Sequence, residues 1–206
     1  MGILVRVVVI GALFGIVTSV ADAMSSPFME WGEPLAGTVW GRGAKVLSLV
    51  LGGGWAWAAL AVGAGWLART PGRGALAGAL ALFAATGAYY WCDSWLGETG
   101  GSPFLWWVVG TPMGLLLGLV GTAVRRPGLV GLAAASVVPA GAAAQMILMP
   151  PRPHMTVTPG IVVAETLVWA VAVAGAGWAV YRFRTGRSAA ADGMRGARGA
   201  AAGRNP

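Results

Sequence analysis

The chain has 206 residues, of which 57% are hydrophobic and only 10% are charged, and its mean hydropathy is +0.71. A soluble domain usually carries about 25% charged residues, so this composition excludes a soluble protein and predicts a membrane protein. The net charge of +7 does not indicate nucleic-acid binding, because most arginines lie in short loops and the C-terminal tail, without a basic stripe of interleaved aromatic residues. One cysteine and one histidine exclude an internal disulfide and a Cys/His metal cluster.

Six apolar runs predict an all-α, polytopic bundle of about six transmembrane helices. Runs of about 20 residues match a hydrocarbon layer of ~30 Å at 1.5 Å per residue. In chain order they cover residues 4–23, 46–68, 74–91, 104–124, 129–149 and 161–181. The first run has a possible signal-peptide cleavage site in Ala21-Asp22-Ala23, but its basic n-region is a single arginine. We expect a retained helix.

The second run is interrupted by three consecutive glycines, Gly52, Gly53 and Gly54. Each glycine weakens a helix by roughly 1 kcal/mol relative to alanine. Non-helical backbone at membrane depth is tolerated only where it is buried in protein or lines a cavity. The run is therefore either one kinked helix or a short entering piece followed by a second helix. Residues 25–45, before it, are expected to form a loop with at most an interfacial turn of helix.

The lysines and arginines predict that both termini are cytoplasmic and that the chain is a multi-pass protein of the cell membrane. With the N-terminus inside, the loops alternate as the positive-inside rule requires. The arginines then assigned to the cytoplasmic side are Arg6, Arg69, Arg73, Arg125, Arg126, Arg182, Arg184, Arg187, Arg195, Arg198 and Arg204. Only Arg42, Lys45 and Arg152 fall outside. Residues 1–181 are the predicted bundle, and residues 182–206 are a predicted disordered basic tail near anionic lipid.

Glycines four residues apart predict close helix packing, because such pairs let two backbones approach. They occur at Gly11/Gly15, at Gly74/Gly78 and at Gly110/Gly114/Gly118.

Three acidic residues at the predicted outer side are the candidate catalytic groups. Asp22 ends the first helix, Asp93 ends the third, and Glu165 lies one turn inside the sixth. Ionisable groups within membrane-spanning segments are functional candidates. Positions four residues apart share a helix face, so Tyr89 accompanies Asp93 and Trp169 accompanies Glu165. We expect the three acids to meet at one aromatic pocket open to the outer side.

The aromatic residues of that half form the predicted wall of the pocket. Nine of the eleven tryptophans fall there, whereas an ordinary aromatic belt occupies both interfaces. The candidate substrate-binding rings are Tyr89, Tyr90, Trp91, Trp106, Trp107, Trp169 and Trp57, and Gln145 is expected to orient a polar group. The alternative is that tyrosine, tryptophan and aspartate merely mark the membrane interface.

A proton donor beside aromatic rings fits two tasks. A carboxylic acid in a low-dielectric pocket holds a proton that it can donate, and the rings stabilise a cation by ~2 kcal/mol or more per desolvated contact. One task is to protonate an alkene or epoxide of a membrane-dissolved isoprenoid and guide the carbocation through ring closure. The other is to exchange a lipophilic organic cation for protons. The chain has no D-D-x-x-D or N-D-x-x-D motif to hold Mg²⁺ on a diphosphate, so we expect no metal and no cofactor.

Three stretches carry a resemblance to known families: Trp55-Ala56-Trp57-Ala58-Ala59-Leu60, Gly65-Trp66-Leu67-Ala68-Arg69, and Gly87-Ala88-Tyr89-Tyr90. They resemble a family of small integral-membrane proteins of high-GC bacteria, mostly without an assigned function, over most of residues 4–181. In size and in its scattered outer-face acids, the chain is also similar to bacterial membrane-bound terpene cyclases that cyclise farnesylated indole diketopiperazines. That second likeness concerns architecture, so no catalytic residue is carried over from it.

The sequence therefore predicts a metal-independent integral-membrane terpene cyclase. Asp93 or Glu165 would be its general acid, with the other or Asp22 as activator or final base. The expected partners are a prenylated small molecule taken from the bilayer and the lipid membrane itself, with no nucleic acid. The alternatives are a small proton-coupled transporter of lipophilic cations and a non-catalytic membrane protein.

Overall fold

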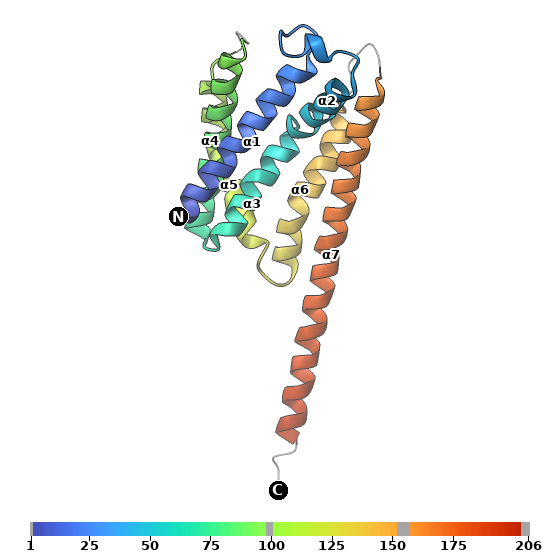
Figure 1. Cartoon of the computed structure of the whole chain (residues 1–206). Coiled ribbons are helices and arrows are strands. Elements are labelled where there is room, and N and C mark those ends of the chain that lie inside the picture. The colour runs from blue at the N-terminus through green and yellow to red at the C-terminus, as the bar shows by residue number, and fades with distance from the viewer. Residues whose placement is uncertain (1, 98–100, 152–156, 203–206) are drawn as a thin grey trace.

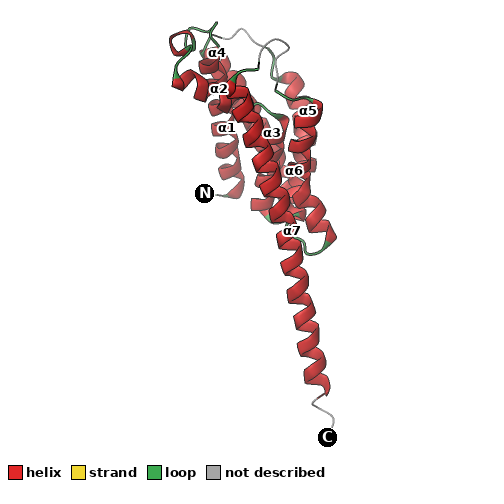
Figure 2. Ribbon diagram, turned by 90° about the vertical axis from the view of Figure 1, so that its right-hand side faces the viewer, coloured by secondary structure: helices red, strands yellow, loops and turns green. Residues whose placement is uncertain are grey.

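The structure is a computed structural model that describes residues 2–97, 101–151 and 157–202, with side chains described as far as residue 186. Within these ranges it is entirely helical (Figures 1 and 2). The elements in chain order are α1 (Ile3–Ser25), the 3-10 turn η1 (Glu33–Leu35), α2 (Val39–Leu51), α3 (Gly54–Ala68), α4 (Pro71–Trp95), α5 (Phe104–Ala123), α6 (Leu129–Leu148) and α7 (Pro159–Ala202).

Five of these helices are long and apolar enough to cross a membrane: α1, α4, α5, α6 and the part of α7 up to Gly186. The pair α2 and α3 passes the same test together, and its two helices are bent by 63° at the glycines between them. The predicted polytopic helical bundle is confirmed, with six spans if the bent pair counts as one. Of the two alternatives for the second run, the structure has two helices joined at a break.

Helix α2 begins earlier than the sequence predicted. Residues 25–45 were expected to form a loop, but the chain is helical from Val39, so that prediction is wrong for its last seven residues. The helix starts there because Thr38 caps it, its Oγ1 accepting a hydrogen bond from the Gly41 N–H at 3.1 Å. Arg42 and Lys45 are exposed on this helix, and their charges conceal it from a search for apolar runs.

Glycines lie where the helices approach most closely. A side chain at Gly11 or Gly15 would overlap the carbonyl oxygen of Ala81 or Ala85 on α4. Between α4 and α5, a side chain at Gly78 would likewise overlap the Gly114 carbonyl oxygen, and one at Gly118 would overlap that of Gly74. The predicted glycine pairs are thus confirmed, with one exception. A Cβ added at Gly110 would meet no atom of another element within 4 Å, so Gly110 takes no part in close packing.

The described arginines of the predicted cytoplasmic set gather at one end of the bundle: Arg6, Arg69, Arg73, Arg125, Arg126, Arg182 and Arg184. Figure 1 shows the N-terminus, the turn between α3 and α4 and the loop between α5 and α6 at this end, with α7 continuing beyond it. The structure carries α7 as a helix to Ala202, whereas the sequence predicted a disordered tail from residue 182. Alanine and arginine are strong helix formers, which gives the tail a helical preference.

Candidate functional site

Two of the three candidate acids meet at the end of the bundle opposite the arginines. Asp22 lies in the last turn of α1, and Asp93 lies near the end of α4 with a side chain only 6% exposed. Hydrogen bonds link them across α1 and α4: Ser19, three residues before Asp22, donates to Asp93, and Tyr89, four residues before Asp93, donates to Asp22. Their hydrogen-bond partners among the described residues are all hydroxyl groups. We call Ser19, Asp22, Ser48, Tyr89 and Asp93 the acid cluster.

Asp22 accepts hydrogen bonds on both of its oxygens. The Tyr89 hydroxyl of α4 donates to Oδ2 at 2.9 Å, and the Ser48 hydroxyl of α2 donates to Oδ1. One carboxyl group therefore joins three helices. Asp93 accepts from the Ser19 hydroxyl of α1 at 3.4 Å, across the seam between α1 and α4.

The glycine seam between α1 and α4 explains why these residues meet. Gly11, Gly15 and Ser19 follow one another at intervals of four along α1, and so do Ala81, Ala85, Tyr89 and Asp93 along α4. Residues four apart share a helix face. Along this face Gly11 packs against Ala81, and one turn later Gly15 packs against Ala85. The next turn brings Ser19 to Asp93. The polar groups thus continue a contact that small residues begin.

A chain of aromatic rings adjoins the acid cluster. Phe14 of α1 meets Trp57 of α3 edge to face at 5.3 Å, and Trp57 meets Tyr89 at 6.4 Å. Tyr89 in turn meets Tyr90 at 5.4 Å. Tyr89 therefore connects the rings to Asp22, because its ring belongs to the chain and its hydroxyl to the carboxylate. Trp57, Tyr89 and Tyr90 are each partly buried.

The other predicted rings lie elsewhere. Trp107 stacks on Phe83 at 4.7 Å and donates its indole N–H to the Phe83 carbonyl, which fastens α5 to α4 on the outside of the bundle. Trp91, Trp106 and Trp169 are 61%, 56% and 41% exposed. Such exposure suits rings that face lipid at an interface. Of the seven predicted rings, Tyr89 contacts an acid directly, and Trp57 and Tyr90 contact the Tyr89 ring.

Neither Glu165 nor Gln145 lies on α1 or α4, the helices that carry the two clustered acids. Glu165 is partly buried on α7, which contacts α2 and α6 but neither α1 nor α4 within the described residues. Gln145 of α6 accepts the Trp55 N–H on its Oε1 at 3.1 Å. That N–H belongs to the first turn of α3, where the break at the glycines leaves it without a helical acceptor. Gln145 thus stabilises the broken helix.

Sequence reasoning missed three contributors: Phe14, Ser19 and Ser48. A four-residue step from Gly15 leads to Ser19, and this step was the available signal. Ser48 is a single hydroxyl within an apolar run, and nothing in its neighbours shows that its partner is Asp22, 26 positions earlier.

Neither of the two clearest cavities in the described part of the chain borders the acid cluster. One, of about 310 Å³, is an apolar hollow beside α1 and α3 that includes Leu60 and Leu67. The other, of about 260 Å³, lies at the arginine-rich end. Within the described ranges, no three histidine, cysteine or acidic side chains gather as metal ligands would.

Comparison with known proteins finds no protein-family model, no curated protein and no solved structure that matches this chain. The resemblance to membrane-bound terpene cyclases therefore stays a prediction, and the function rests on the residues themselves.

Proposed function

We propose that the acid cluster is a proton-transfer centre and that the protein is a metal-independent cyclase of a prenylated substrate dissolved in the bilayer. The observation that carries the proposal is that hydrogen bonds link Asp22 and Asp93 across the adjacent helices α1 and α4. Tyr89, which donates to Asp22, also contacts the ring of Trp57. A carboxyl group that served only to mark the interface would not need a second acid from another helix, nor burial to 6% exposure.

The hydrogen bonds suggest a division of roles. Asp22 accepts on both oxygens, which suits an ionised carboxylate because that form has acceptors only. Asp93 accepts one long hydrogen bond from Ser19 and suits the acid form. Two neighbouring carboxyl groups commonly hold one proton between them, because like charges disfavour double ionisation. Asp93 is the proposed proton donor and Asp22 the proposed final base.

The reaction balances without a co-reactant. The Asp93 proton adds to an alkene carbon of the prenyl chain, and the adjacent carbon becomes a carbocation. A second double bond attacks that carbon and closes the ring, which moves the positive charge along the chain. Asp22 then removes a proton from a carbon next to the charge, and a new double bond forms. The product is an isomer of the substrate, and passage of the proton from Asp22 back to Asp93 restores the starting state.

The aromatic rings supply the environment for the cation. A ring face stabilises a desolvated cation by ~2 kcal/mol or more, and Trp57, Tyr89 and Tyr90 are contiguous. All three rings are partly buried, so we expect the substrate to enter by displacing them from the bilayer side.

The test is conversion of a farnesylated indole acceptor by membranes that contain the full-length protein. We expect cyclised products of unchanged mass from the wild type, and their loss in Asp93→Asn and Asp22→Asn. Glu165→Gln is the matched control, because it neutralises an acid outside the cluster and should retain activity. Product that persists in both aspartate variants would remove the proposed acid and base roles.

A proton-coupled carrier of lipophilic cations is the second candidate, favoured by the enclosure of Asp93 between α1 and α4. A group so enclosed exchanges protons with either side only when helices move, which is how a carrier alternates its access. Proton-driven uptake of a lipophilic dye cation into proteoliposomes, abolished by Asp93→Asn and without any isomerised product, would favour the carrier over the cyclase.

A further inference from the structure

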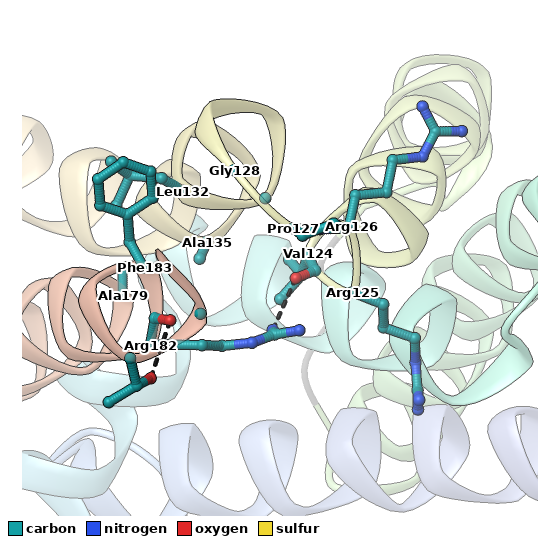
Figure 3. A pocket seen from close by; sticks show the side chains of 13 residues that line it. Val124, Arg125, Arg126, Pro127, Gly128, Leu132, Ala135, Ala179, Arg182 and Phe183 are labelled. Carbon is teal, nitrogen blue, oxygen red and sulfur yellow. Dashed lines mark hydrogen bonds between the residues drawn. The ribbon is translucent and has the colours of Figure 1, made fainter. Parts of the chain in front are cut away.

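A second site lies at the opposite end of the bundle from the acid cluster. Here the loop after α5, the start of α6 and the part of α7 around Arg182 enclose a cavity of about 260 Å³ (Figure 3). Three of its thirteen lining residues are arginines, Arg125, Arg126 and Arg182, and none is acidic. The lining therefore carries a net positive charge, although Figure 3 shows the guanidinium groups of Arg125 and Arg126 directed away from Arg182.

Two of these arginines are held by backbone carbonyls, which leave their charge uncompensated. Arg182 reaches from α7 across the cavity and donates to the Val124 carbonyl at 2.6 Å (Figure 3). Arg125 donates its Nε–H to the Trp66 carbonyl at 2.8 Å and lies 4.4 Å over the Trp66 ring. A guanidinium group has five N–H donors, so each keeps donors for a further acceptor.

The start of α6 adds a second source of positive potential. Its first turn borders the cavity, with Gly128 and Gly131 among the lining residues. Gly128 precedes the helix with φ +78° and has no side chain to cap the first N–H groups. Uncapped N–H groups and the positive end of the helix dipole favour an anion at this position.

Apart from Thr185, whose hydroxyl donates to backbone carbonyls of α7, the side chains of the remaining wall are apolar. Figure 3 shows Leu132, Phe183 and Ala179 on the side of the cavity away from Arg125 and Arg126, with Ala135 nearer the middle. A small inorganic anion does not need an apolar wall, whereas a phospholipid has a charged phosphate joined to an acyl chain. Basic pockets between membrane helices suit such headgroups.

We propose that this cavity binds the phosphate of an anionic phospholipid, with Arg182 as the central contact and Arg126 as an accessory charge. Phe183 and Leu132 border the glycerol and the first acyl carbons. The site is independent of the proposed cyclase activity, since it uses α5, α6 and α7 at the other end of the bundle.

The test measures lipid binding by the full-length protein, delipidated in a neutral detergent, with native mass spectrometry and thermal unfolding as readouts. The probes are phosphatidylglycerol, phosphatidylcholine and inorganic phosphate. We expect retained phosphatidylglycerol, little phosphatidylcholine, and no protection by inorganic phosphate alone. Arg182→Gln and Arg126→Gln should each weaken phosphatidylglycerol binding about fivefold, the effect expected for one basic residue at an anionic surface.

Arg73→Gln is the matched control, because Arg73 is exposed at the same end of the bundle but does not line the cavity. Arg182→Gln could also disturb folding, because Arg182 donates to the Val124 carbonyl. Arg126→Gln removes a charge without removing that hydrogen bond, so it tests lipid binding separately from folding. Equal binding of phosphatidylcholine, equal protection by inorganic phosphate, an equal loss in Arg73→Gln, or unchanged binding in Arg126→Gln would each overturn the proposal.

Discussion

Substitution of Gly15 by alanine tests the seam that positions the acid cluster. The new Cβ would lie 2.9 Å from the Tyr89 nitrogen and closer still to the Ala85 carbonyl oxygen, whereas ordinary contact begins near 3.4 Å. The two helices must separate by at least 0.5 Å at this level. The Ser19–Asp93 hydrogen bond is already 3.4 Å long, so the same separation breaks it.

The expected change in the free energy of unfolding combines three effects. Overpacking costs about 1–3 kcal/mol, and loss of a hydrogen bond costs about 1 kcal/mol. The higher helix propensity of alanine offsets up to ~1 kcal/mol of this destabilisation. Gly15→Ala should therefore destabilise the protein by roughly 1–3 kcal/mol, or about 2–4 °C in Tm per kcal/mol for a chain of this length.

The assay is thermal unfolding in detergent, with Gly63→Ala as the matched control. Gly63 is also in the interior of a helix, but a Cβ there meets nothing within 4 Å. The two substitutions should therefore shift Tm in opposite directions. A Gly15→Ala variant as stable as Gly63→Ala would refute the packing of α1 on α4 and, with it, the geometry of the acid cluster.

Three further predictions follow from single contacts. Tyr89→Phe removes the hydroxyl donated to Asp22 while keeping the ring, so it should destabilise the protein by about 1.5–3 kcal/mol in chemical unfolding, whereas Tyr90→Phe should change little. Gln145→Leu leaves the Trp55 N–H without its acceptor and should cost about 1–3 kcal/mol; an unchanged unfolding midpoint would contradict this role. In a Cys92→Ala background, Ser94→Cys should react with an impermeant maleimide on intact cells and Arg126→Cys only after lysis; the reverse pattern would invert the predicted orientation.

The spans were predictable because hydrophobicity is a property of each stretch by itself. Residues such as those of α1 and α5 need no knowledge of their neighbours to be recognised as membrane-spanning. The break in the second run was predictable for the same reason, since three glycines weaken any helix. Only the start of α2, residues 39–45, escaped detection, because its charged residues dilute its hydropathy.

The acid cluster was only partly predictable. Spacing along one helix places Tyr89 and Asp93 on the same face, but it does not say which helix that face meets. From the sequence, both Asp22 and Glu165 were expected to join Asp93, with Glu165 rather than Asp22 as the other candidate general acid. The structure joins Asp22 to the cluster and leaves Glu165 on α7, because α1 packs on α4 and α7 packs on α2 and α6.

The sequence by itself determined the helical class, the number of apolar runs, the gathering of arginines at alternate turns and the glycine spacings that allow close approach. Tertiary structure alone decided which glycine faces pair and that Gln145 supports the start of α3. It also decided that Tyr89 bonds to Asp22 while Trp57 and Tyr90 contact the Tyr89 ring. The physical reason is that insertion into a membrane depends on the composition of each segment, whereas a site depends on pairs of faces. Pairing is set by shape complementarity between helices, which no single segment records.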